Sequence, residues 1–463
     1  MTDAFAALLG PLGWLTGADA AAYARDWTGD WQGEPIGVAR PRDRAEAAAL
    51  VRLCAAREVA LVPAGGRTGL TGGAVVGERP AIVVSLERMA AIRALDAVEG
   101  TIVAEAGCAI AALQRAAAEA GRLFPLSFGA EGSATVGGAL STNAGGIRAL
   151  RYGSARDLCL GIEAVLPDGS LLDELRRVRK NNTGYDLRHL LIGAEGTLGL
   201  ITAAAFRLAP PLRVLETALV AVPSPAAALA LFARLDEGGA DLVAFELIGA
   251  LPWGAALARG LRAPLPEGPP WWCLVEAGSP DASRPLRPML EARIAAALEA
   301  GEATDATFAD SEAARAHLWK IRETIPEGTR ALGPALPTDV AVPVSAVPEF
   351  LARAEAALAR GWPEARFVAF GHLGDGNIHI VALGPAGEEQ KAWKRRLAAA
   401  EEAINDIAVS LGGSFSAEHG IGRSKLAAMR RLKPPPALAA MRAIKAALDP
   451  RVLFNPGTLI PDG

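Results

Sequence analysis

Three of the five histidines in this 463-residue chain lie in two short stretches near its C-terminal end. The first stretch, FGHLGDGNIHI from Phe370 to Ile380, places His372 and His379 on either side of Asp375-Gly376. Asp-Gly between apolar runs predicts a two-residue hairpin turn, because both turn positions need a positive φ. Such a turn would set His372 directly opposite His379, with Cβ atoms about 4.5–5.5 Å apart. Two imidazoles at that spacing could share one metal ion.

A third histidine follows in the second stretch, Ser416 to Gly422, where Glu418 precedes His419 in a glycine-rich turn. Two histidines and a carboxylate are a usual ligand set for a catalytic divalent metal with an open coordination position. Each stretch alone is also compatible with a hairpin and a solvated Glu-His pair that bind nothing. The ligand set does not separate a metal-dependent hydrolase from an oxidoreductase.

Glycine-rich segments indicate a large cofactor in the N-terminal half. They run from Ala64 to Gly73, from Gly129 to Gly146 and from Ile192 to Thr202. Glycine lets backbone amides approach a ligand closely and converge on an anion. Neither G-x-G-x-x-G nor G-x-x-x-x-G-K-[ST] occurs, so the usual dinucleotide and nucleotide loops are excluded. The pattern favours a cofactor with a diphosphate and ring edges, and a hydrolase would leave these segments without a purpose.

Composition bounds the class of protein. Lys and Arg number 47 against 51 Asp and Glu, a net charge of −4, and no basic block occurs, which argues against nucleic-acid binding. Four widely spaced cysteines without Cys-x-x-Cys predict reduced core thiols in a cytosolic protein. The N-terminus lacks a basic region, and Pro11 and Gly13 interrupt its apolar run, so we expect neither a signal peptide nor a transmembrane segment.

The order of elements predicts an α+β protein with several parts. Strands and helices alternate around the glycine segments up to Pro210-Pro211, which we interpret as a domain boundary; they include a helix expected over Arg44–Arg57 and a strand expected to end near Pro125. Beyond the boundary comes the β-α-β-β-α order of a ferredoxin-like sheet, beginning with a strand over Val214–Val222. A long helix is expected after the histidine hairpin, over Glu388–Leu411. The expected parts are an N-terminal helical segment (1–36), a cofactor domain (37–211), a cap with the histidine hairpin (212–410) and a C-terminal segment (411–463).

With these pieces in view the chain resembles the flavin-linked D-2-hydroxyacid dehydrogenases of the vanillyl-alcohol-oxidase type, a group that includes D-lactate, glycolate and D-2-hydroxyglutarate dehydrogenases. The resemblance covers about Arg40 to Gly457 and rests on eight motifs in the family's order. These are Pro63–Gly73, Gly132–Gly146, Lys180–Asp186, Ile192–Thr202, Leu318–Glu323, Gly371–His379, Ala417–Gly422 and Asn455–Gly457.

The resemblance implies a two-part FAD-binding domain, a ferredoxin-like cap and a C-terminal helical segment that returns to the FAD domain. His372, His379 and Glu418 match the metal ligands, with zinc the leading candidate, while His419 matches the catalytic base and Arg322 the arginine that grips the substrate carboxylate. The residues expected to contact FAD are Pro63, Gly65, Gly66, Arg67, Thr68, Gly69, Leu70, Gly132, Ser133, Thr135, Gly137, Gly138, Thr142, Asn143, Gly145, Gly146, Glu195, Gly196, Gly199, Ile201 and Asn455.

The implied reaction is oxidation of a D-2-hydroxy acid to the 2-oxo acid. Where the 2-hydroxyglutarate branch has polar residues, this chain aligns Val381, Thr338 and Pro326, which favours D-lactate or another short substrate. D-2-Hydroxyglutarate or D-malate dehydrogenase activity, or a non-catalytic flavin subunit of a larger complex, are the alternatives. A one-residue slip of the alignment after Arg322 is also left open.

Partners and location follow from the same resemblance. Electrons would pass to a quinone, an electron-transferring flavoprotein or a cytochrome, and a homodimer is left open. We expect a cytoplasmic protein, with peripheral association at the inner membrane as an alternative. FAD is expected to be bound without a covalent link, because neither histidine nor cysteine occurs in Ala64–Gly73 or Gly129–Gly146.

Overall fold

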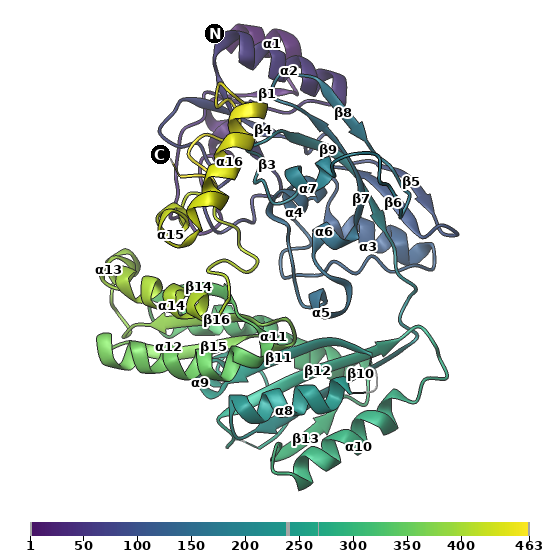
Figure 1. Ribbon diagram of the computed structural model, residues 1–463, viewed down its shortest axis with the longest axis vertical. Coiled ribbons are helices and arrows are strands. Elements are labelled where there is room, and N and C mark those ends of the chain that lie inside the picture. The colour runs from purple at the N-terminus through teal and green to yellow at the C-terminus, as the bar shows by residue number, and fades with distance from the viewer. Residues whose placement is uncertain (1, 238–240, 267, 462–463) are drawn as a thin grey trace. The chain divides into compact units, whose positions relative to one another are not determined.

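The computed structural model describes residues 2–237, 241–266 and 268–461. They form two compact units, between which the chain passes more than once (Figure 1). Unit 1 contains the chain up to Gly146, then Tyr152–Pro211, and the final segment from Glu418. Unit 2 contains Ile147–Arg151 and Leu212–Ala417. Arg322, His372 and His379 belong to unit 2, and Glu418 and His419 belong to unit 1.

Unit 1 is built on two sheets. The four-stranded sheet has the order β1 (Trp14–Leu15), β2 (Val38–Ala39), β4 (Ala81–Ser85) and β3 (Ala60–Ala64). The five-stranded sheet has the order β5 (Ile92–Asp96), β6 (Thr101–Glu105), β9 (Leu200–Arg207), β7 (Cys159–Val165) and β8 (Leu171–Glu174). β3 and β4 pair in parallel, whereas the second sheet is antiparallel. Every residue of β4 is buried, as expected for a parallel strand covered on both faces.

The helices of unit 1 cover these sheets. They are α1 (Thr2–Leu9), α2 (Arg44–Arg57), α3 (Ile110–Glu119), α4 (Val136–Thr142), α6 (Ala155–Leu158), α7 (Leu187–Leu191), α15 (Leu426–Leu432), α16 (Pro435–Leu448) and the 3₁₀ helix η1 (Gly17–Tyr23). α5 (Ala149–Tyr152) lies where the chain passes from unit 2 back to unit 1. The Asp43 side chain caps α2 by accepting a hydrogen bond from the Glu46 amide, and Glu58 ends it in the left-handed conformation.

Unit 2 is built on one seven-stranded sheet. Its order is β13 (Asp305–Phe308), β10 (Val214–Val222), β12 (Trp271–Ser279), β11 (Leu242–Gly249), β15 (Arg366–His372), β16 (Asn377–Leu383) and β14 (Ala335–Ala341). The first four strands alternate with helices as in a ferredoxin-like unit, which confirms the predicted fold class. The histidine hairpin, β15 and β16, and then β14 extend that same sheet.

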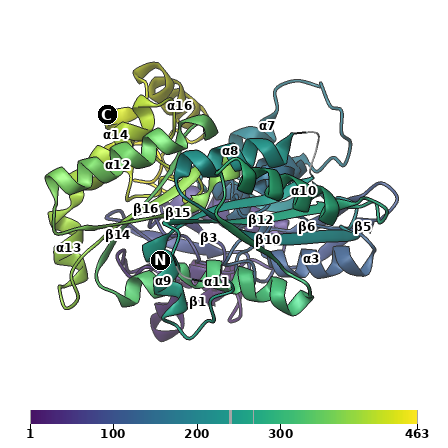
Figure 2. The same ribbon diagram turned by 90° about the horizontal axis from the view of Figure 1, so that it is seen from below.

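Helices cover both faces of this sheet (Figure 2). They are α8 (Pro225–Asp236), α9 (Ala250–Leu257), α10 (Leu286–Glu299), α11 (Glu312–Ala331), α12 (Val347–Gly361), α13 (Gln390–Arg396), α14 (Ala398–Ser410), and the 3₁₀ helices η2 (Val344–Ala346) and η3 (Leu373–Asp375). Leu247 and Ile380 pack with α8, α10, α12 and α14 on one face. Ile248, Phe370 and Val381 pack with α9 and α11 on the other, which we call the α11 face.

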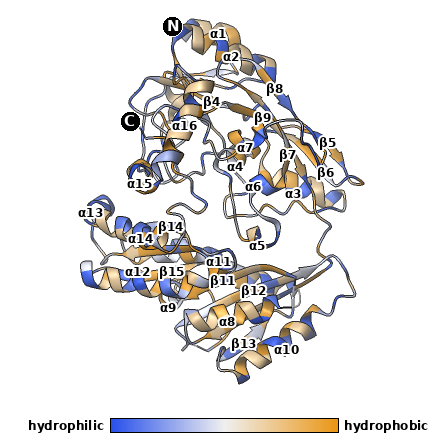
Figure 3. Cartoon of the chain, in the orientation of Figure 1, coloured by the Kyte–Doolittle hydropathy of each residue, from blue (hydrophilic) through white to orange (hydrophobic). Residues whose placement is uncertain are grey.

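The apolar residues gather on the strands, and the exposed helix α13 is largely hydrophilic (Figure 3). All four cysteines are buried and free, as predicted for core thiols. No helix among the described residues is long and apolar enough to cross a membrane.

Candidate active site and cofactor loops

The histidine hairpin forms, but with a different register from the predicted one. The loop spans the 3₁₀ turn Leu373–Asp375 and Gly376, which alone takes the left-handed conformation, with φ 80°. His372 therefore pairs with Asn377, and His379 pairs with Phe370. A shift of two residues keeps both histidines on one face, whereas a shift of one would have separated them. Their ring centroids lie 5.8 Å apart, and one ring nitrogen of each lies within 4.8 Å of the other.

A buried glutamate that sequence reasoning missed connects His372 to Arg322. Glu246 lies on β11 opposite His372 and has no exposed surface. Its Oε1 lies 2.5 Å from His372 Nδ1, and its Oε2 accepts a hydrogen bond from Arg322 Nε at 2.6 Å. Because a carboxylate only accepts hydrogen bonds, His372 donates to Glu246 through Nδ1–H.

The charge of Glu246 is well defined. Burial favours its neutral form, but the charge of Arg322 and the hydrogen bonds from His372 and Arg322 outweigh burial and lower the pKa of Glu246 to about 2. A buried carboxylate of this kind persists only where its partners stay in place.

His379 also has a carboxylate behind it. Asp339 on β14 pairs with His379 and is 1% exposed. Its Oδ1 lies 3.6 Å from His379 Nδ1 and accepts a hydrogen bond from Asn377 Nδ2 at 2.9 Å. Both histidines of the hairpin, His372 and His379, thus present Nδ1 to an acidic residue, the arrangement that usually orients histidine ligands toward a metal.

Arg322 projects from α11 over the same face of the sheet. Its guanidinium carbon lies 5.0 Å from the centre of the Phe370 ring, and the residue is 8% exposed. Only Nε is engaged by Glu246; within the described ranges its two terminal NH₂ groups donate to no protein acceptor. A buried guanidinium with an unused fork suits a carboxylate ligand.

The strand register decides which of the aligned residues share a sheet face with His379. Val381 pairs with Pro337, and both lie on the α11 face with His379. Thr338 instead pairs with Ile380 on the opposite face, where its hydroxyl donates to the Ile380 carbonyl at 3.1 Å. The expectation that Thr338 faces the substrate is therefore wrong, because successive strand residues alternate between faces. Pro337 occupies the position on the α11 face that was expected for Thr338.

Glu418 and His419 belong to unit 1, at the start of its last segment. Ala417, the last residue of unit 2, donates its amide to the Asp339 carbonyl at 3.3 Å. Within unit 1, an added Cβ at Gly145 would lie 3.7 Å from Glu418 Oε2, and Thr71 Oγ1 donates to the His419 carbonyl at 3.4 Å. The segment with the predicted base is thus anchored beside the predicted FAD loops.

The glycine segments of unit 1 meet backbone to backbone. A Cβ at Gly66 would lie 2.0 Å from the Ser133 carbonyl oxygen, and one at Gly65 would lie 2.6 Å from Thr135 Oγ1. Gly196 has φ 69°, and a Cβ there would lie 2.8 Å from Pro63 Cγ. A small hollow of about 20 Å³ is lined in part by Arg67, Gly69 and Gly73. These approaches suit a cofactor held through main-chain groups.

Glu195, one of the predicted FAD contacts, has another task. It has φ 50° and is 8% exposed, and its two carboxylate oxygens accept the amides of Ile421 and Gly422, each at 2.7 Å. Burial raises its pKa, although these hydrogen bonds and Lys425 act in the opposite direction. Its side chain therefore holds the turn that follows His419.

Other predicted polar contacts also stabilise loops. Thr135 Oγ1 caps α4 by accepting from the Gly138 amide, and Thr142 Oγ1 donates to the Gly138 carbonyl. Asn143 Oδ1 accepts from Ser154 and Arg156, and Asn455 Nδ2 donates to the Gly73 and Glu195 carbonyls, both at 2.8 Å.

The remaining predicted FAD residues lie along the same segments of unit 1. Arg67 lies over the Tyr23 ring at 4.1 Å, and Ile201 is buried in β9. The others are Thr68, Leu70, Gly132, Gly137, Gly146 and Gly199. Any FAD contact made by the set as a whole would come mainly from the backbone.

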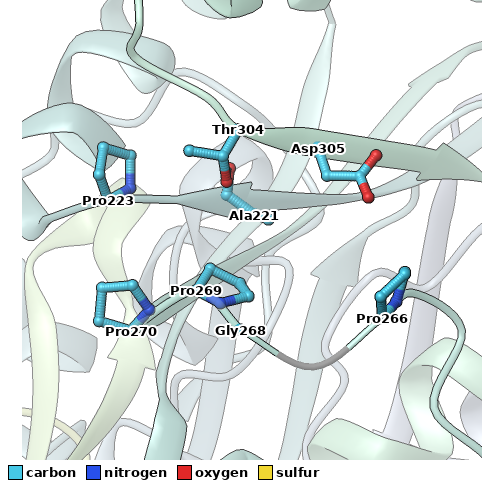
Figure 4. Close-up of a pocket in the computed structure, with 8 residues that line it drawn as sticks. All are labelled: Ala221, Pro223, Pro266, Gly268, Pro269, Pro270, Thr304 and Asp305. Carbon is cyan, nitrogen blue, oxygen red and sulfur yellow. The ribbon is translucent and has the colours of Figure 1, made fainter.

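A larger hollow lies in unit 2, and no predicted catalytic residue or metal ligand lines it. The hollow has a volume of about 390 Å³. Figure 4 shows its proline-rich lining, which includes Pro223, Pro266, Pro270, Thr304 and Asp305. None of its lining residues belongs to the predicted site.

Comparison with known proteins defines the class. Residues 35–174 match the family described as FAD binding domain, and residues 212–459 match FAD linked oxidases, C-terminal domain. The fold is shared with p-cresol methylhydroxylase (TM-score 0.80, 16% identity, 100% of this chain and 96% of that one). It is also shared with alkyldihydroxyacetonephosphate synthase (TM-score 0.75, 16% identity, 98% and 86%). The chain is therefore an FAD-linked oxidoreductase with a vanillyl-alcohol-oxidase-type fold.

The chain belongs to the FAD-linked oxidases, as the sequence motifs predicted. It is 39% identical to the D-2-hydroxyglutarate dehydrogenase of Xanthomonas citri pv. viticola over 445 residues, covering 96% of this chain and 93% of that protein. The D-2-hydroxyglutarate dehydrogenase of Stutzerimonas stutzeri is 34% identical (99% and 98%). The mitochondrial enzyme of Bos taurus is 36% identical (94% and 79%).

Glu246 and Asp339 are the functional candidates that sequence reasoning missed. Glu246 interrupts the apolar strand LVAFELIG, and Asp339 follows Pro337-Thr338 in another buried strand. A lone acidic residue in a buried strand needs a partner, and that signal was available in the sequence. The identity of each partner was not.

Proposed function

We propose that this protein oxidises a short D-2-hydroxy acid, such as D-lactate, to the 2-oxo acid, with FAD as electron acceptor and a divalent metal as second cofactor. The observation that carries this proposal is the Glu246 cluster, which joins a carboxylate-binding arginine and a histidine ligand on one face of one sheet. An α-hydroxy acid has a carboxylate that the arginine would bind. It also has a hydroxyl that would bind the metal held by the histidine.

The donor set fits a divalent cation. His372 and His379 supply ring nitrogens within 4.8 Å of each other, and each has an acidic residue at Nδ1. Glu418 would complete the set; it is the next residue after Ala417, which is hydrogen-bonded to Asp339. Two imidazoles and one carboxylate suit zinc first, and also manganese or iron.

Each protein group then has a task. Arg322 binds the substrate carboxylate through its terminal NH₂ groups and so orients the α-carbon. His419 takes the hydroxyl proton while the α-hydrogen leaves. A bound divalent metal would lower the pKa of the substrate hydroxyl, and bound FAD would take up the α-hydrogen together with its two electrons. The apolar surroundings of Phe370 and Val381 limit water around the reacting carbon.

The pocket beyond the carboxylate favours a short substrate. Val381 and Pro337 lie beside His379 on the α11 face, and Pro326 lies one helical turn beyond Arg322. None of them can pair with a second carboxylate, and an unpaired carboxylate taken out of water costs several kcal/mol. D-2-Hydroxyglutarate is the second candidate, because relatives at 34–39% identity carry that name.

A dye-linked assay on the FAD-loaded protein tests the proposal. D-lactate, D-2-hydroxyglutarate and D-malate are compared side by side, with the L-enantiomers as controls. An artificial acceptor removes the dependence on a quinone, an electron-transferring flavoprotein or a cytochrome. We expect higher kcat/KM for D-lactate than for either dicarboxylate; a tenfold or greater preference for a dicarboxylate selects the second candidate, and no oxidation of any 2-hydroxy acid refutes the proposal.

A further inference from the structure

Glu246 occupies an unusual position for an acidic residue. It lies in the middle of β11, a strand whose residues are all buried, and it has no exposed surface. A carboxylate taken out of water in this way is strongly destabilising unless charged or hydrogen-bonding partners compensate it. The partners here come from two other elements, α11 and β15.

Each carboxylate oxygen of Glu246 serves a different group. Oε1 lies 2.5 Å from His372 Nδ1, and Oε2 lies 2.6 Å from Arg322 Nε. The side chain therefore cannot move toward one partner without lengthening its contact with the other. Asp339 stands 3.6 Å from His379 Nδ1, so the second histidine has a looser support.

The two contacts have distinct consequences. With its proton on Nδ1, a neutral His372 presents the Nε2 lone pair, which is the form that binds a metal. With Nε held by Glu246, the guanidinium of Arg322 has a fixed plane, and its terminal NH₂ groups point as one fork. Ligand orientation and carboxylate orientation thus depend on the same two oxygens.

We propose that Glu246 is a positioning residue that couples the metal ligand His372 to the carboxylate-binding Arg322. The inference rests on the proposed function, in which both groups act on one 2-hydroxy acid. Loss of the Glu246 carboxylate weakens metal binding and substrate binding together, whereas loss of an ordinary buried carboxylate changes neither.

Glu276 supplies a matched control. It lies on the neighbouring strand β12, paired with Ala244 two residues from Glu246, and it is 2% exposed. Its Oε2 accepts from Trp319 Nε1 on α11 at 2.8 Å and from Thr217 at 3.1 Å. It contacts the same helix as Glu246, but the hydrogen bonds of Glu276 involve neither His372 nor Arg322.

The experiment compares wild type, Glu246→Gln, Glu246→Asp and Glu276→Gln, all loaded with FAD. Zinc affinity is measured by competition with a chromophoric chelator, and KM and kcat by the dye assay. We expect Glu246→Gln to weaken zinc binding about 10- to 100-fold and to raise KM. Glu246→Asp keeps a carboxylate but is one methylene too short to reach both partners. We expect its zinc affinity and KM to lie between those of wild type and those of Glu246→Gln. Glu276→Gln stays within about twofold of wild type, the size of an unrelated change.

A second measurement needs no variant of Glu246. Nitrogen NMR of ¹⁵N-histidine-labelled, metal-free wild type, with His372 assigned by His372→Asn, reports which ring nitrogen holds the proton. We expect it on Nδ1. A proton on Nε2 overturns the coupling, as does a folded Glu246→Gln with wild-type zinc affinity and KM. If His372 holds its Nδ1 proton but no 2-hydroxy acid is oxidised, the proposed function fails and the Glu246 contact stands.

Discussion

Two buried glutamates, one in each unit, hold candidate site residues by different means. In unit 1, Glu195 receives only main-chain donors, the amides of Ile421 and Gly422, and burial raises its pKa. In unit 2, Glu246 receives two side chains, Arg322 and His372, and its pKa falls to about 2 in spite of burial. Glu195, which is held by backbone amides, stabilises the conformation of a loop. Glu246, which is held by ionisable side chains, determines how those side chains are oriented.

The contrast extends to the surroundings of each residue. Near Glu195 the backbone is so close that a Cβ at Gly422 would lie 2.2 Å from the Thr71 carbonyl oxygen. Around Glu246 the contacts are between side chains on one sheet face. We therefore expect substitutions that add atoms to impair unit 1 most. Substitutions that remove side-chain groups should impair unit 2 most.

His419 differs from the rest of unit 1, because its proposed role depends on its side chain. Its substitution should have the largest effect on activity. The backbone carbonyl of His419 is held by Thr71, but its imidazole is the proposed base. His419→Ala should slow flavin reduction by roughly two to four orders of magnitude in single-turnover measurements. His189→Ala, an exposed histidine of the same unit, is the control. A wild-type rate in the His419 variant would assign the base to another group.

Gly66→Ala tests the sensitivity of unit 1 to added atoms. Its Cβ would lie 2.0 Å from the Ser133 carbonyl oxygen, so one loop must move. Overpacking costs about 1–3 kcal/mol, and we expect FAD affinity to fall about 5- to 150-fold. The control is Gly129→Ala, at a position that is not among the predicted FAD contacts and where an added Cβ meets no atom within 4 Å. The FAD affinity of both variants is measured from flavin fluorescence on dilution. Equal FAD affinities would contradict a cofactor site formed by closely packed backbone segments.

Substrate length tests the unit 2 pocket. Val381→Asn with Pro337→Lys adds two polar side chains on the face that carries His379. We expect the ratio of kcat/KM for D-2-hydroxyglutarate to that for D-lactate to rise about tenfold, equivalent to about 1.4 kcal/mol. Thr338→Val, on the opposite face, should leave the ratio unchanged. An effect from the Thr338 variant alone would place the substrate elsewhere.

The smallest expected effect is a pH dependence at Glu195. A raised pKa means that its stabilising contribution is complete below the unfolded value of about 4.5 and declines as pH rises through the folded value. Glu195→Gln has no proton to lose. The stability advantage of wild type over this variant, from urea unfolding between pH 4.5 and 8, should therefore shrink with pH. An advantage that grows with pH would show that the two amides outweigh burial.

Much of the architecture was predictable from local patterns. Arg44–Arg57 is helical as predicted, with the Asp43 side chain capping its start, and Val214–Val222 is a strand as predicted. The long helix expected over Glu388–Leu411 is instead two helices separated at buried Leu397. The strand expected to end near Pro125 is reduced to an isolated bridge between Leu123 and Ala209.

The site was predictable in its residue types but not in its support. Two histidines near Asp-Gly indicated a hairpin, yet the loop took Leu373 to Gly376 and shifted the register by two. Glu246 lies 126 residues from His372 along the chain, and only the strand order β11–β15 brings them together. Partners joined by sheet topology leave no local signal in the sequence.

The most direct test of the central claim is anaerobic stopped-flow reduction of bound FAD by D-lactate, before and after metal removal. Metal content is verified by elemental analysis, and L-lactate is the stereochemical control. The account predicts rapid bleaching of the flavin by D-lactate in the metal-loaded protein only. It also predicts that the metal-free protein keeps its FAD and regains the reaction when zinc is restored. Equally fast reduction in the verified metal-free protein would contradict it.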